Sequence, residues 1–419
     1  MRRRYFYGWN VVAATFVMAV FSFGLGFYGL SVYVATLQRL HGWSAAAVSA
    51  PVTVYYVGGA LLTMVIGDVY ARWGPRIVVA QGTVAMATGV AALGVVSQPW
   101  QLYPAFIVMS LGWGAMSGAA INIILAPWWE RRRGLAVSLA FNGATLGGVL
   151  VAPMLIPLIG ALGVSGALTI AALAHLVVML GVSVGVLRQA PAELGLAPDG
   201  DPVSPRSHMG TASSSPPGRR AALRTWRFWS VSAPFALGLA AQVGVLTHLV
   251  ALATPALGVA GAGRAVSVTT AAAVIGRLLT GLVVDRLNRR LVTSATLVIQ
   301  MAGLIVLQRM PSPMGVYAGC VLFGLGVGNL TTLPGLVLAH EWPRERFASL
   351  VALVVGINQL TFAFGPSLVG VLRDRAEGYG LALGACVALQ AVAAITVMLG
   401  PRRASSEPGS ELDEQPGRA

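Results

Sequence analysis

Long apolar runs separated by short polar segments dominate the sequence. A helix needs about 20 apolar residues to cross the hydrocarbon core of a bilayer. Twelve runs of about this length occur, at residues 10–36, 45–67, 77–97, 102–127, 134–159, 163–187, 228–253, 265–284, 291–308, 314–339, 348–371 and 379–399. The pattern therefore predicts an all-α membrane protein with twelve transmembrane helices.

The composition agrees with this pattern. Hydrophobic residues make up 56% of the chain and charged residues only 10%, with a mean hydropathy of +0.75, whereas soluble proteins carry about 25% charged residues. The net charge of +14 comes from 28 arginines without a single lysine. Because all of these arginines but one lie between the apolar runs rather than along one face, we expect a lipid bilayer and no nucleic acid as partner.

The placement of the arginines predicts the orientation. With the N-terminus in the cytoplasm, the cytoplasmic segments hold 22 arginines and the external loops hold five, namely Arg39, Arg264, Arg309, Arg373 and Arg375. Short loops rich in arginine stay in the cytoplasm, so both termini are expected there. Of the 28 arginines only Arg277 remains, and it lies inside the eighth apolar run.

Residues 188–227 interrupt the apolar pattern with proline, serine, glycine and charged residues. Such a composition is typical of a disordered linker, which we place in the cytoplasm. It divides the chain into an N-terminal six-helix bundle, residues 1–187, and a C-terminal six-helix bundle, residues 228–400. The polar segment 401–419 is expected to form a disordered cytoplasmic tail.

Arg277 is the residue with the most unusual chemistry. It lies eight residues from Asp285, which is about 12 Å along a helix and near the middle of a hydrocarbon core about 30 Å thick. Arginine cannot lose its proton, and no Asp or Glu lies inside an assigned run. Its planar fork fits a carboxylate bidentately. We therefore expect the missing anion to be the substrate; the alternative is that backbone carbonyls and hydroxyls such as that of Thr280 hold Arg277.

The two halves repeat each other in parallel orientation. Residues 131–155 align with residues 344–368 at a constant offset of 213. A pair of glycines four residues apart occurs at 114–118 in the first half and again at 324–328 in the second. Because such glycines let helix backbones approach closely, we predict a packing role for them. Two parallel six-helix halves related by pseudo-two-fold symmetry resemble the major facilitator superfamily, and the chain is expected to adopt that fold.

A loop signature of that superfamily is partly present in both halves. It consists of glycine, three residues, aspartate, arginine, any residue, glycine, any residue and arginine. The first copy has Gly67, Arg72, Gly74 and Arg76, with Ala71 in place of the aspartate. The second copy has Gly281, Asp285, Arg286 and Arg290, with Asn288 in place of the second glycine. The resemblance implies that these loops latch one conformation through charge-paired contacts; the alternative is that their arginines only set the topology.

Three stretches resemble the branch of monocarboxylate transporters and oxalate:formate antiporters. They are YFYGWNVVAATF (5–16), SVYVATLQRLHGWSAAAVS (31–49) and WWERRRGLAVSLAFNGATLGG (128–148). The resemblance implies a substrate-binding arginine in the eighth helix followed by a small residue four positions later, which here are Arg277 and Gly281.

The chain departs from that branch at three positions. Ala273 stands where proton-coupled members have an aspartate, Tyr28 where they have a lysine, and Asn358 where the oxalate carrier has its second basic residue. One fixed positive charge suits a monoanion better than a dianion. The missing aspartate argues against proton symport by that route, and the sequence leaves open coupling to a proton, to sodium or to a counter-anion.

Several other polar residues fall within the predicted helices. Amides or hydroxyls that could hydrogen-bond a substrate are offered by Asn122, Asn329, Asn358, Gln359 and Tyr28, although the amides could equally join helices. His248 is a midplane group that titrates near neutrality, and a hydrogen-bonded structural histidine is the alternative favoured for it.

We therefore predict a monomeric secondary carrier, or facilitator, of a small monocarboxylate that works by alternating access, without a metal or a cofactor. An exporter of drugs or other hydrophobic compounds is the main alternative. A membrane enzyme is disfavoured because HExxH, GxSxG and nucleotide-binding glycine motifs are missing from the sequence, and a sensor is disfavoured because no output domain is recognisable. The lysine-free composition suggests a bacterial inner membrane.

Overall fold

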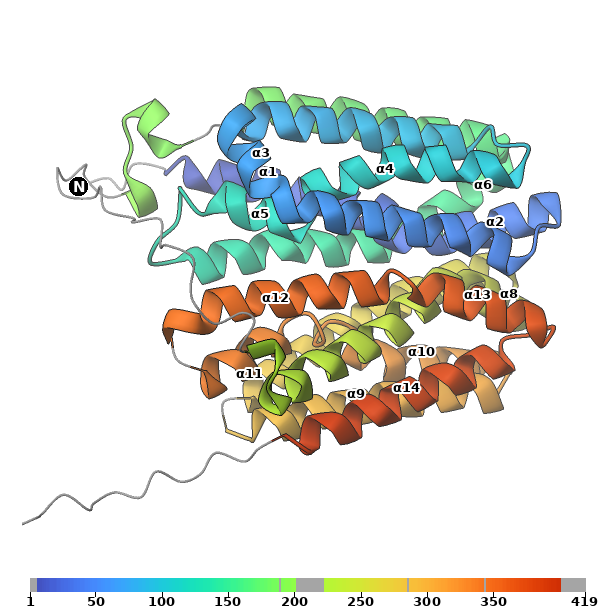
Figure 1. Cartoon of the computed structure of the whole chain (residues 1–419). Helices are drawn as coiled ribbons and strands as arrows, with labels where there is room; N and C mark the ends of the chain where they lie inside the picture. The colour runs from blue at the N-terminus through green and yellow to red at the C-terminus, as the bar shows by residue number, and fades with distance from the viewer. Residues whose placement is uncertain (1–5, 188–189, 201–221, 285, 343, 401–419) are drawn as a thin grey trace, which may run out of the picture.

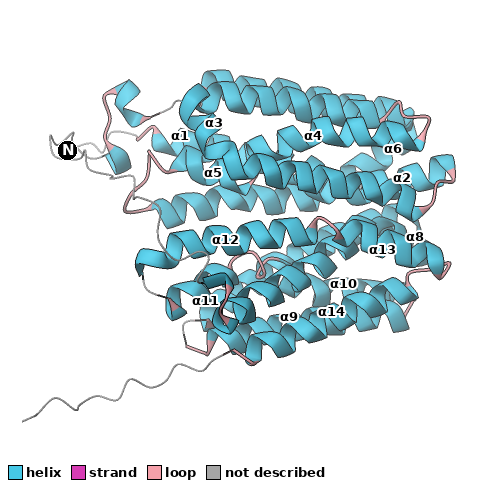
Figure 2. Cartoon of the chain, viewed as in Figure 1, coloured by secondary structure: helices cyan, strands magenta, loops and turns pink. Residues whose placement is uncertain are grey.

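The computed structural model describes residues 6–187, 190–200, 222–284, 286–342 and 344–400, and within these ranges it contains helices and no strand (Figure 2). In chain order the main helices are α1 (Gly8–Phe23), the π-helix η1 (Gly24–Tyr28), α2 (Gly29–His41), α3 (Ala45–Leu93), α4 (Leu102–Met116), α5 (Gly118–Leu125), α6 (Arg133–Gly185), α8 (Trp226–Val283), α9 (Arg289–Arg309), α10 (Pro313–Val327), α11 (Leu333–Glu341), α12 (Arg344–Phe362), α13 (Gly365–Arg375) and α14 (Gly380–Met398).

The helices form two groups with roughly parallel axes. One group contains α1 to α6 and the other contains α8 to α14 (Figure 1). The first and last described residues lie at the same end of the molecule. We call this end the terminal end and the opposite one the distal end.

The twelve predicted spans can all be found in these helices. Eight segments are long and apolar enough to cross a membrane. Three of them, α3, α6 and α8, each contain two spans, because the chain turns at Gly74, Gly163 and Gly258, whose φ angles are 72°, 70° and 66°. These left-handed angles are costly for residues with a Cβ atom. The shorter pair α10 and α11 supplies the tenth span.

The fourth and tenth spans, predicted as continuous, are both broken. Ser117 leaves the helical conformation between α4 and α5, with φ −79° and ψ −166°, and residues 328–332 separate α10 from α11. Both breaks coincide with the glycine stretches of the sequence. Gly324 does pack closely, since a methyl group there would lie 2.8 Å from Ala272 Cβ on α8. The same stretches therefore bring helices together and weaken them locally.

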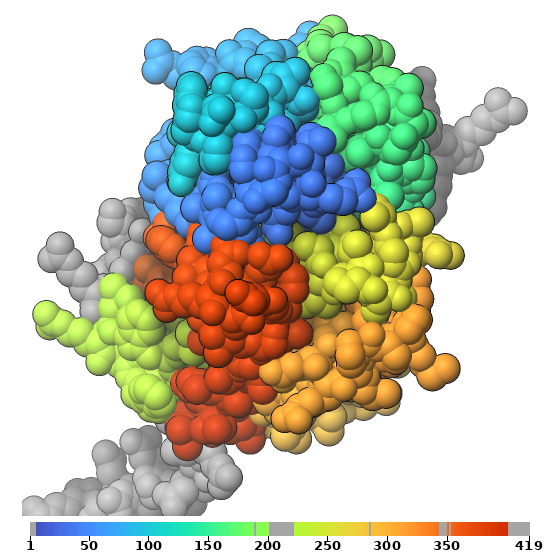
Figure 3. Space-filling model, turned by 90° about the vertical axis from the view of Figure 1, so that its right-hand side faces the viewer, coloured from blue at the N-terminus to red at the C-terminus, as the bar shows by residue number. Residues whose placement is uncertain are grey.

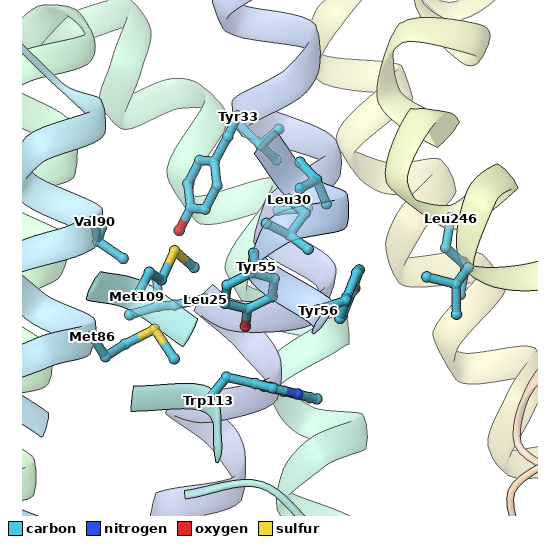
Figure 4. Close-up of a cluster of buried hydrophobic side chains, with 14 of the residues drawn as sticks. Leu25, Leu30, Tyr33, Tyr55, Tyr56, Met86, Val90, Met109, Trp113 and Leu246 are labelled. Carbon is cyan, nitrogen blue, oxygen red and sulfur yellow. The ribbon is translucent and has the colours of Figure 1, made fainter. Parts of the chain in front are cut away.

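Large side chains fill the space between the helices. In the first group Tyr33, Tyr55 and Trp113 are surrounded by methionine and aliphatic side chains (Figure 4). Apolar side chains also cover the outside: Leu278 and Leu282 on α8 are 66% and 68% exposed. An apolar exterior is what a bilayer requires, since lipid and not water surrounds these helices.

Part of the predicted linker is ordered, contrary to the disorder that its composition predicts. Residues 190–200 contain two short 3-10 turns, Pro191–Leu194 and Pro198–Gly200. Asp199 accepts hydrogen bonds from the backbone of Glu130 and Arg131, at 3.1 and 2.8 Å, and its own N–H donates to the Trp128 carbonyl at 3.0 Å. These local bonds tie the segment to the first group of helices. Residues 188–189 and 201–221 of the linker, and the predicted tail 401–419, lie outside the described residues.

Candidate functional site

Arg277 lies in the second span of α8, and its guanidinium rests against the break in the tenth span. A methyl group added to Gly328 would come within 2.8 Å of Arg277 Nη2 and 3.0 Å of Nε. Gly328 follows the last residue of α10. The guanidinium thus occupies space that is free because Gly328 has no side chain.

The described part of the chain offers Arg277 no counter-ion. Its Nε is buried without a hydrogen-bond partner, and none of the ion pairs found among the described residues includes it. The Thr280 hydroxyl, one of the groups that could have held it, accepts a hydrogen bond from Asn329 Nδ2 at 2.8 Å. Because arginine stays protonated, a positive charge within the span is left without a partner.

Tyr28, on the first span, is a polar side chain close to Arg277. It lies at the end of η1, a π-helical turn in the middle of the first span. Such turns are rare and frequently occur at functional sites. The hydroxyl of Tyr55, on α3, donates to the Gly26 carbonyl at 2.6 Å, so a neighbouring helix stabilises the irregular turn that positions Tyr28.

Gly148 brings three segments together at this point. A methyl group there would lie 2.6 Å from both Tyr28 Cε2 and Thr270 Cγ2. The first span, α6 and α8 can therefore approach one another beside Tyr28 only because residue 148 is glycine. The site consequently contains elements of both halves of the chain.

Asn329 connects the break in the tenth span to α8. Its Nδ2 donates to Thr280 Oγ1 at 2.8 Å and to the Leu325 carbonyl at 3.2 Å. The side chain is almost fully buried, and its Oδ1 has no hydrogen-bond partner. The amide therefore joins helices, next to Arg277, while one acceptor remains unused.

The other four predicted binding residues have partners or surroundings of their own. Asn122 Nδ2 bonds back to the Gly118 carbonyl of its own helix at 2.9 Å. Asn358, on α12, is buried with its Oδ1 unpartnered, and its neighbour Gln359 is half-buried. His248 is fully buried, and its two ring nitrogens lie 3.2 Å from Tyr379 Oη and 3.1 Å from the Pro366 carbonyl. The structure thus groups Arg277 with Tyr28 and Asn329, and among the described residues no hydrogen bond or ion pair links these to the other four.

The two loop signatures differ in structure. In the first, Gly74 adopts a positive φ and begins the turn, while Gly67, Arg72 and Arg76 are exposed. In the second, Asn288 replaces the glycine and caps α9, its side chain accepting from the Arg290 N–H at 2.9 Å. Gly281 and Arg286 are exposed, and Asp285 lies outside the described residues.

Arg290 is the member of these signatures with extensive contacts. It pairs bidentately with Glu341 at the end of α11, at 2.6 and 2.8 Å. It also donates to Ser230 Oγ on α8 at 3.1 Å and to the Val397 carbonyl on α14 at 2.7 Å. This arginine therefore ties together four helix ends of the second group at the terminal end.

The comparisons with known proteins support one family. The model of the Major Facilitator Superfamily matches residues 16–366 and 250–417. The chain belongs to the Major Facilitator Superfamily. It is therefore an integral membrane transporter and not an enzyme, in agreement with the sequence-based expectation.

Among the relatives of this facilitator is monocarboxylate transporter 11 of Homo sapiens, which is 30% identical over 400 residues, covering 88% of this chain and 78% of that one. A candidate anionic 4-hydroxy-benzoate permease of Thauera aromatica is 36% identical over 99 residues, which are 24% of this chain and 60% of the permease. A point mutant of the nucleoside transporter NupG has the same fold, with a TM-score of 0.75 at 13% identity, covering 93% of this chain and 99% of that one.

The two halves of this facilitator meet closely at the distal end. Asp374, near the end of α13, accepts hydrogen bonds from the N–H groups of Ala45 and Ala46, at 3.0 and 2.7 Å, which begin α3. Amides in the first turn of a helix have no partner within the helix, and a carboxylate there is stabilised by the helix dipole. Asp374 therefore caps a helix of the opposite half.

Further contacts join α3 to α13 and to α12. The Thr53 and Ser367 hydroxyls lie 2.6 Å apart. The ring of Tyr56 meets that of Phe362, the last residue of α12, edge to face with centroids 5.4 Å apart. Between α8 and α6, Ser267 donates to the Val149 carbonyl at 2.6 Å. The described structure is thus closed between the two halves at the distal end.

Sequence reasoning did not identify the π-helical turn, the break beside Arg277 or these distal contacts. The glycines at 24, 26 and 29 in the first span are a signal for an irregular turn. No comparable signal marks Asp374, since a single acid near a helix end is ordinary and its partners are 328 residues or more away.

The contact between Gly328 and Arg277 leads to a prediction. Replacing Gly328 with alanine is expected to displace the guanidinium and to raise the KM for the transported anion about tenfold, because a shift of about 1 Å in a binding group costs one to two orders of magnitude. The measurement is initial uptake into proteoliposomes. The control is Gly335→Ala on α11, where an added methyl group meets no atom within 4 Å; equal KM values for the two variants would contradict the prediction.

Proposed function

We propose that this facilitator transports a small monocarboxylate by alternating access, with Arg277 binding the carboxylate. The observation that carries the proposal is the unpaired positive charge of Arg277 in the second span of α8, beside the break at Gly328. An isolated charge in a bilayer is costly and indicates function. A carboxylate would supply the missing charge and accept two parallel hydrogen bonds from one guanidinium.

The surroundings of Arg277 fit one small anion. Tyr28 can contribute a hydroxyl from the first span, while Asn329 stabilises the break. A dianion would require a second cation, and Arg277 is accompanied at this site by none among the described residues. The names of the two relatives, a monocarboxylate transporter and a candidate anionic 4-hydroxy-benzoate permease, support the same class of substrate.

Uptake of a substrate panel into proteoliposomes tests this proposal. The panel contains lactate, pyruvate, benzoate and 4-hydroxybenzoate, the dicarboxylates oxalate and succinate, and the neutral amide benzamide. Each is measured with and without imposed pH and sodium gradients, which identifies the coupled ion or shows exchange. We expect saturable uptake of at least one monocarboxylate and none of the dicarboxylates or the amide. Uptake confined to neutral hydrophobic compounds would instead favour the drug exporter.

The proposed orientation places the terminal end in the cytoplasm and the distal end outside the cell, because the terminal-end segments carry most of the arginines. The membrane we propose is a bacterial inner membrane. A cysteine introduced at Ser97, in the exposed loop between α3 and α4, and labelled by an impermeant reagent on whole cells tests the orientation. Labelling only after cell lysis would contradict it.

Alternating access requires the distal contact to open in every cycle. We therefore predict that a disulfide between cysteines introduced at Thr53 and Ser367, whose hydroxyls are 2.6 Å apart, stops transport. Oxidation should abolish uptake and dithiothreitol should restore it, while each single cysteine variant remains insensitive to oxidation. Native Cys320 and Cys386 are buried, so we expect them to contribute little to the cross-linking. Undiminished uptake by fully cross-linked protein would rule out this movement.

A further inference from the structure

A cavity lies at the distal end, on the opposite side of the closed contact from the terminal end. Its volume is about 630 Å³, and it is lined from both halves, by the end of α2 and the following turn, by α8 near its own turn, and by the junction of α13 and α14. Figure 3 looks onto this end, where the blue, yellow and red segments that carry these linings meet. We call this cavity the distal vestibule.

The distal vestibule is positively charged. Two arginines line it, Arg39 from α2 and Arg373 from α13. Arg39 is exposed and has no ion pair within the described ranges, whereas Arg373 donates to Asp374 at 3.0 Å. Since Asp374 balances one of the two charges, the vestibule keeps one net positive charge, as the site at Arg277 does.

The rest of the lining provides polar groups on one side and apolar walls on the other. Gln38 also lines the vestibule, and its Nε2 is buried without a hydrogen-bond partner. Apolar walls come from Ile156 and Val250, one from each half. Ligand sites typically combine apolar walls with a few convergent polar groups in about 300–1,000 Å³, and this vestibule has both properties.

The distal vestibule and the site at Arg277, which we call the central site, both border the first span. Ala35 in its lining is seven residues beyond Tyr28 on the first span, which corresponds to about 10 Å along a helix. Between them lie the close contacts of Tyr28 with Gly148 and Thr270. An anion in the vestibule would thus be separated from Arg277 by the closed contact between the halves.

We propose that the distal vestibule is a second binding site for the transported anion, occupied while the distal contact is closed. The proposal rests on the proposed function for the class of anion, a small monocarboxylate with an apolar body. Arg39 and the Gln38 amide bind the carboxylate, and the apolar walls contact the body. Electrostatic focusing in a charged cleft raises the local concentration of anions before the contact opens.

Thiol labelling of purified protein tests the vestibule independently of transport. A cysteine is introduced at Ala251, which lines the vestibule on α8, and both native cysteines are buried. Its labelling rates are measured with an anionic methanethiosulfonate carrying a sulfonate and with neutral methyl methanethiosulfonate. Adding Arg39→Gln is expected to slow the anionic reagent about fivefold and to leave the neutral one unchanged. The difference should shrink at 1 M salt, where the Debye length falls to about 3 Å.

Benzoate protection completes the experiment. Benzoate at millimolar concentration is expected to slow labelling of Ala251→Cys, and to do so equally in an Arg277→Met background, because the vestibule binds without the central site. Protein reconstituted in phosphatidylcholine alone excludes anionic lipid headgroups as the bound species. The matched control is Arg264→Gln, an exposed arginine that does not line the vestibule, and it should change neither rate.

Two results would overturn the proposal. One is an equal response of the anionic and neutral reagents to Arg39→Gln, and the other is loss of benzoate protection in the Arg277→Met background. Neither result argues against Arg277 as the residue that binds the transported carboxylate, which uptake measurements test. Failure of this inference and failure of the proposed function are therefore distinguishable.

Discussion

Replacing Arg277 with methionine is expected to lower kcat/KM for monocarboxylate uptake at least 100-fold while leaving the free energy of unfolding unchanged or higher. Two charge-assisted hydrogen bonds are lost with the guanidinium, each worth about 1.5–3 kcal/mol, and every 1.4 kcal/mol is a factor of about ten. Stability does not fall because the buried Nε has no partner to lose, and a charged side chain in a span is itself destabilising. Loss of activity without loss of stability is the signature of a functional residue.

The controls separate the charge of Arg277 from its shape. Arg277→Lys keeps the charge but not the planar fork, so it should retain some uptake, about tenfold below the parent. Arg264→Met removes an exposed arginine from the same helix and should leave uptake unchanged. Initial rates in proteoliposomes and thermal unfolding in detergent are the two measurements. A marked loss of stability in Arg277→Met would show a structural role for Arg277.

Replacing Glu341 with alanine is expected to have the largest effect on stability, a loss of about 3 kcal/mol in the free energy of unfolding. The Arg290 side chain is only 9% exposed and the Glu341 side chain 15%. Removing one partner of a buried pair leaves an uncompensated charge, which typically costs about 3–5 kcal/mol. The remaining bonds of Arg290 to Ser230 and Val397 do not neutralise it. Reversible unfolding in mixed micelles measures the change.

A double variant distinguishes a lost ion pair from lost packing. Arg290→Met combined with Glu341→Leu removes both charges and should recover most of the stability, since apolar replacements of buried pairs are often neutral. Arg286→Ala, in the same loop but exposed, should change the free energy of unfolding by less than about 0.5 kcal/mol. Equal stability of Glu341→Ala and the parent would mean that the pair does not hold the helix ends together.

Hydropathy alone was sufficient to predict the transmembrane helices, because each span must be apolar over a fixed length. It also predicted the position of Arg277, since one charge within such a run is conspicuous. The identity of its surroundings could not be predicted in the same way. Gly328 on the tenth span and Tyr28 on the first span lie next to Arg277. The register between those helices and α8 depends on packing across the molecule.

The irregular parts of the spans show the same limit. The sequence predicts continuous fourth and tenth helices, and both are broken, at Ser117 and after Val327. Apolar composition cannot reveal a break, because lipid tolerates it only where protein neighbours satisfy the freed backbone groups. In the first span, the Tyr55 hydroxyl is such a neighbour, since it donates to the Gly26 carbonyl of the π-helical turn. Similarly, Asp374 lies just beyond the eleventh predicted run, and its role in capping α3 follows only from the three-dimensional structure.

The most direct test of the central claim compares one charge on the protein with one charge on the substrate. Uptake of benzoate and benzamide is measured for the parent and for Arg277→Gln, which forms a thermodynamic cycle. The account predicts that the parent prefers benzoate at least 100-fold and that Arg277→Gln reduces this preference to less than about threefold. An Arg277→Gln variant that still prefers benzoate 100-fold would show that the carboxylate is bound elsewhere and would contradict the account.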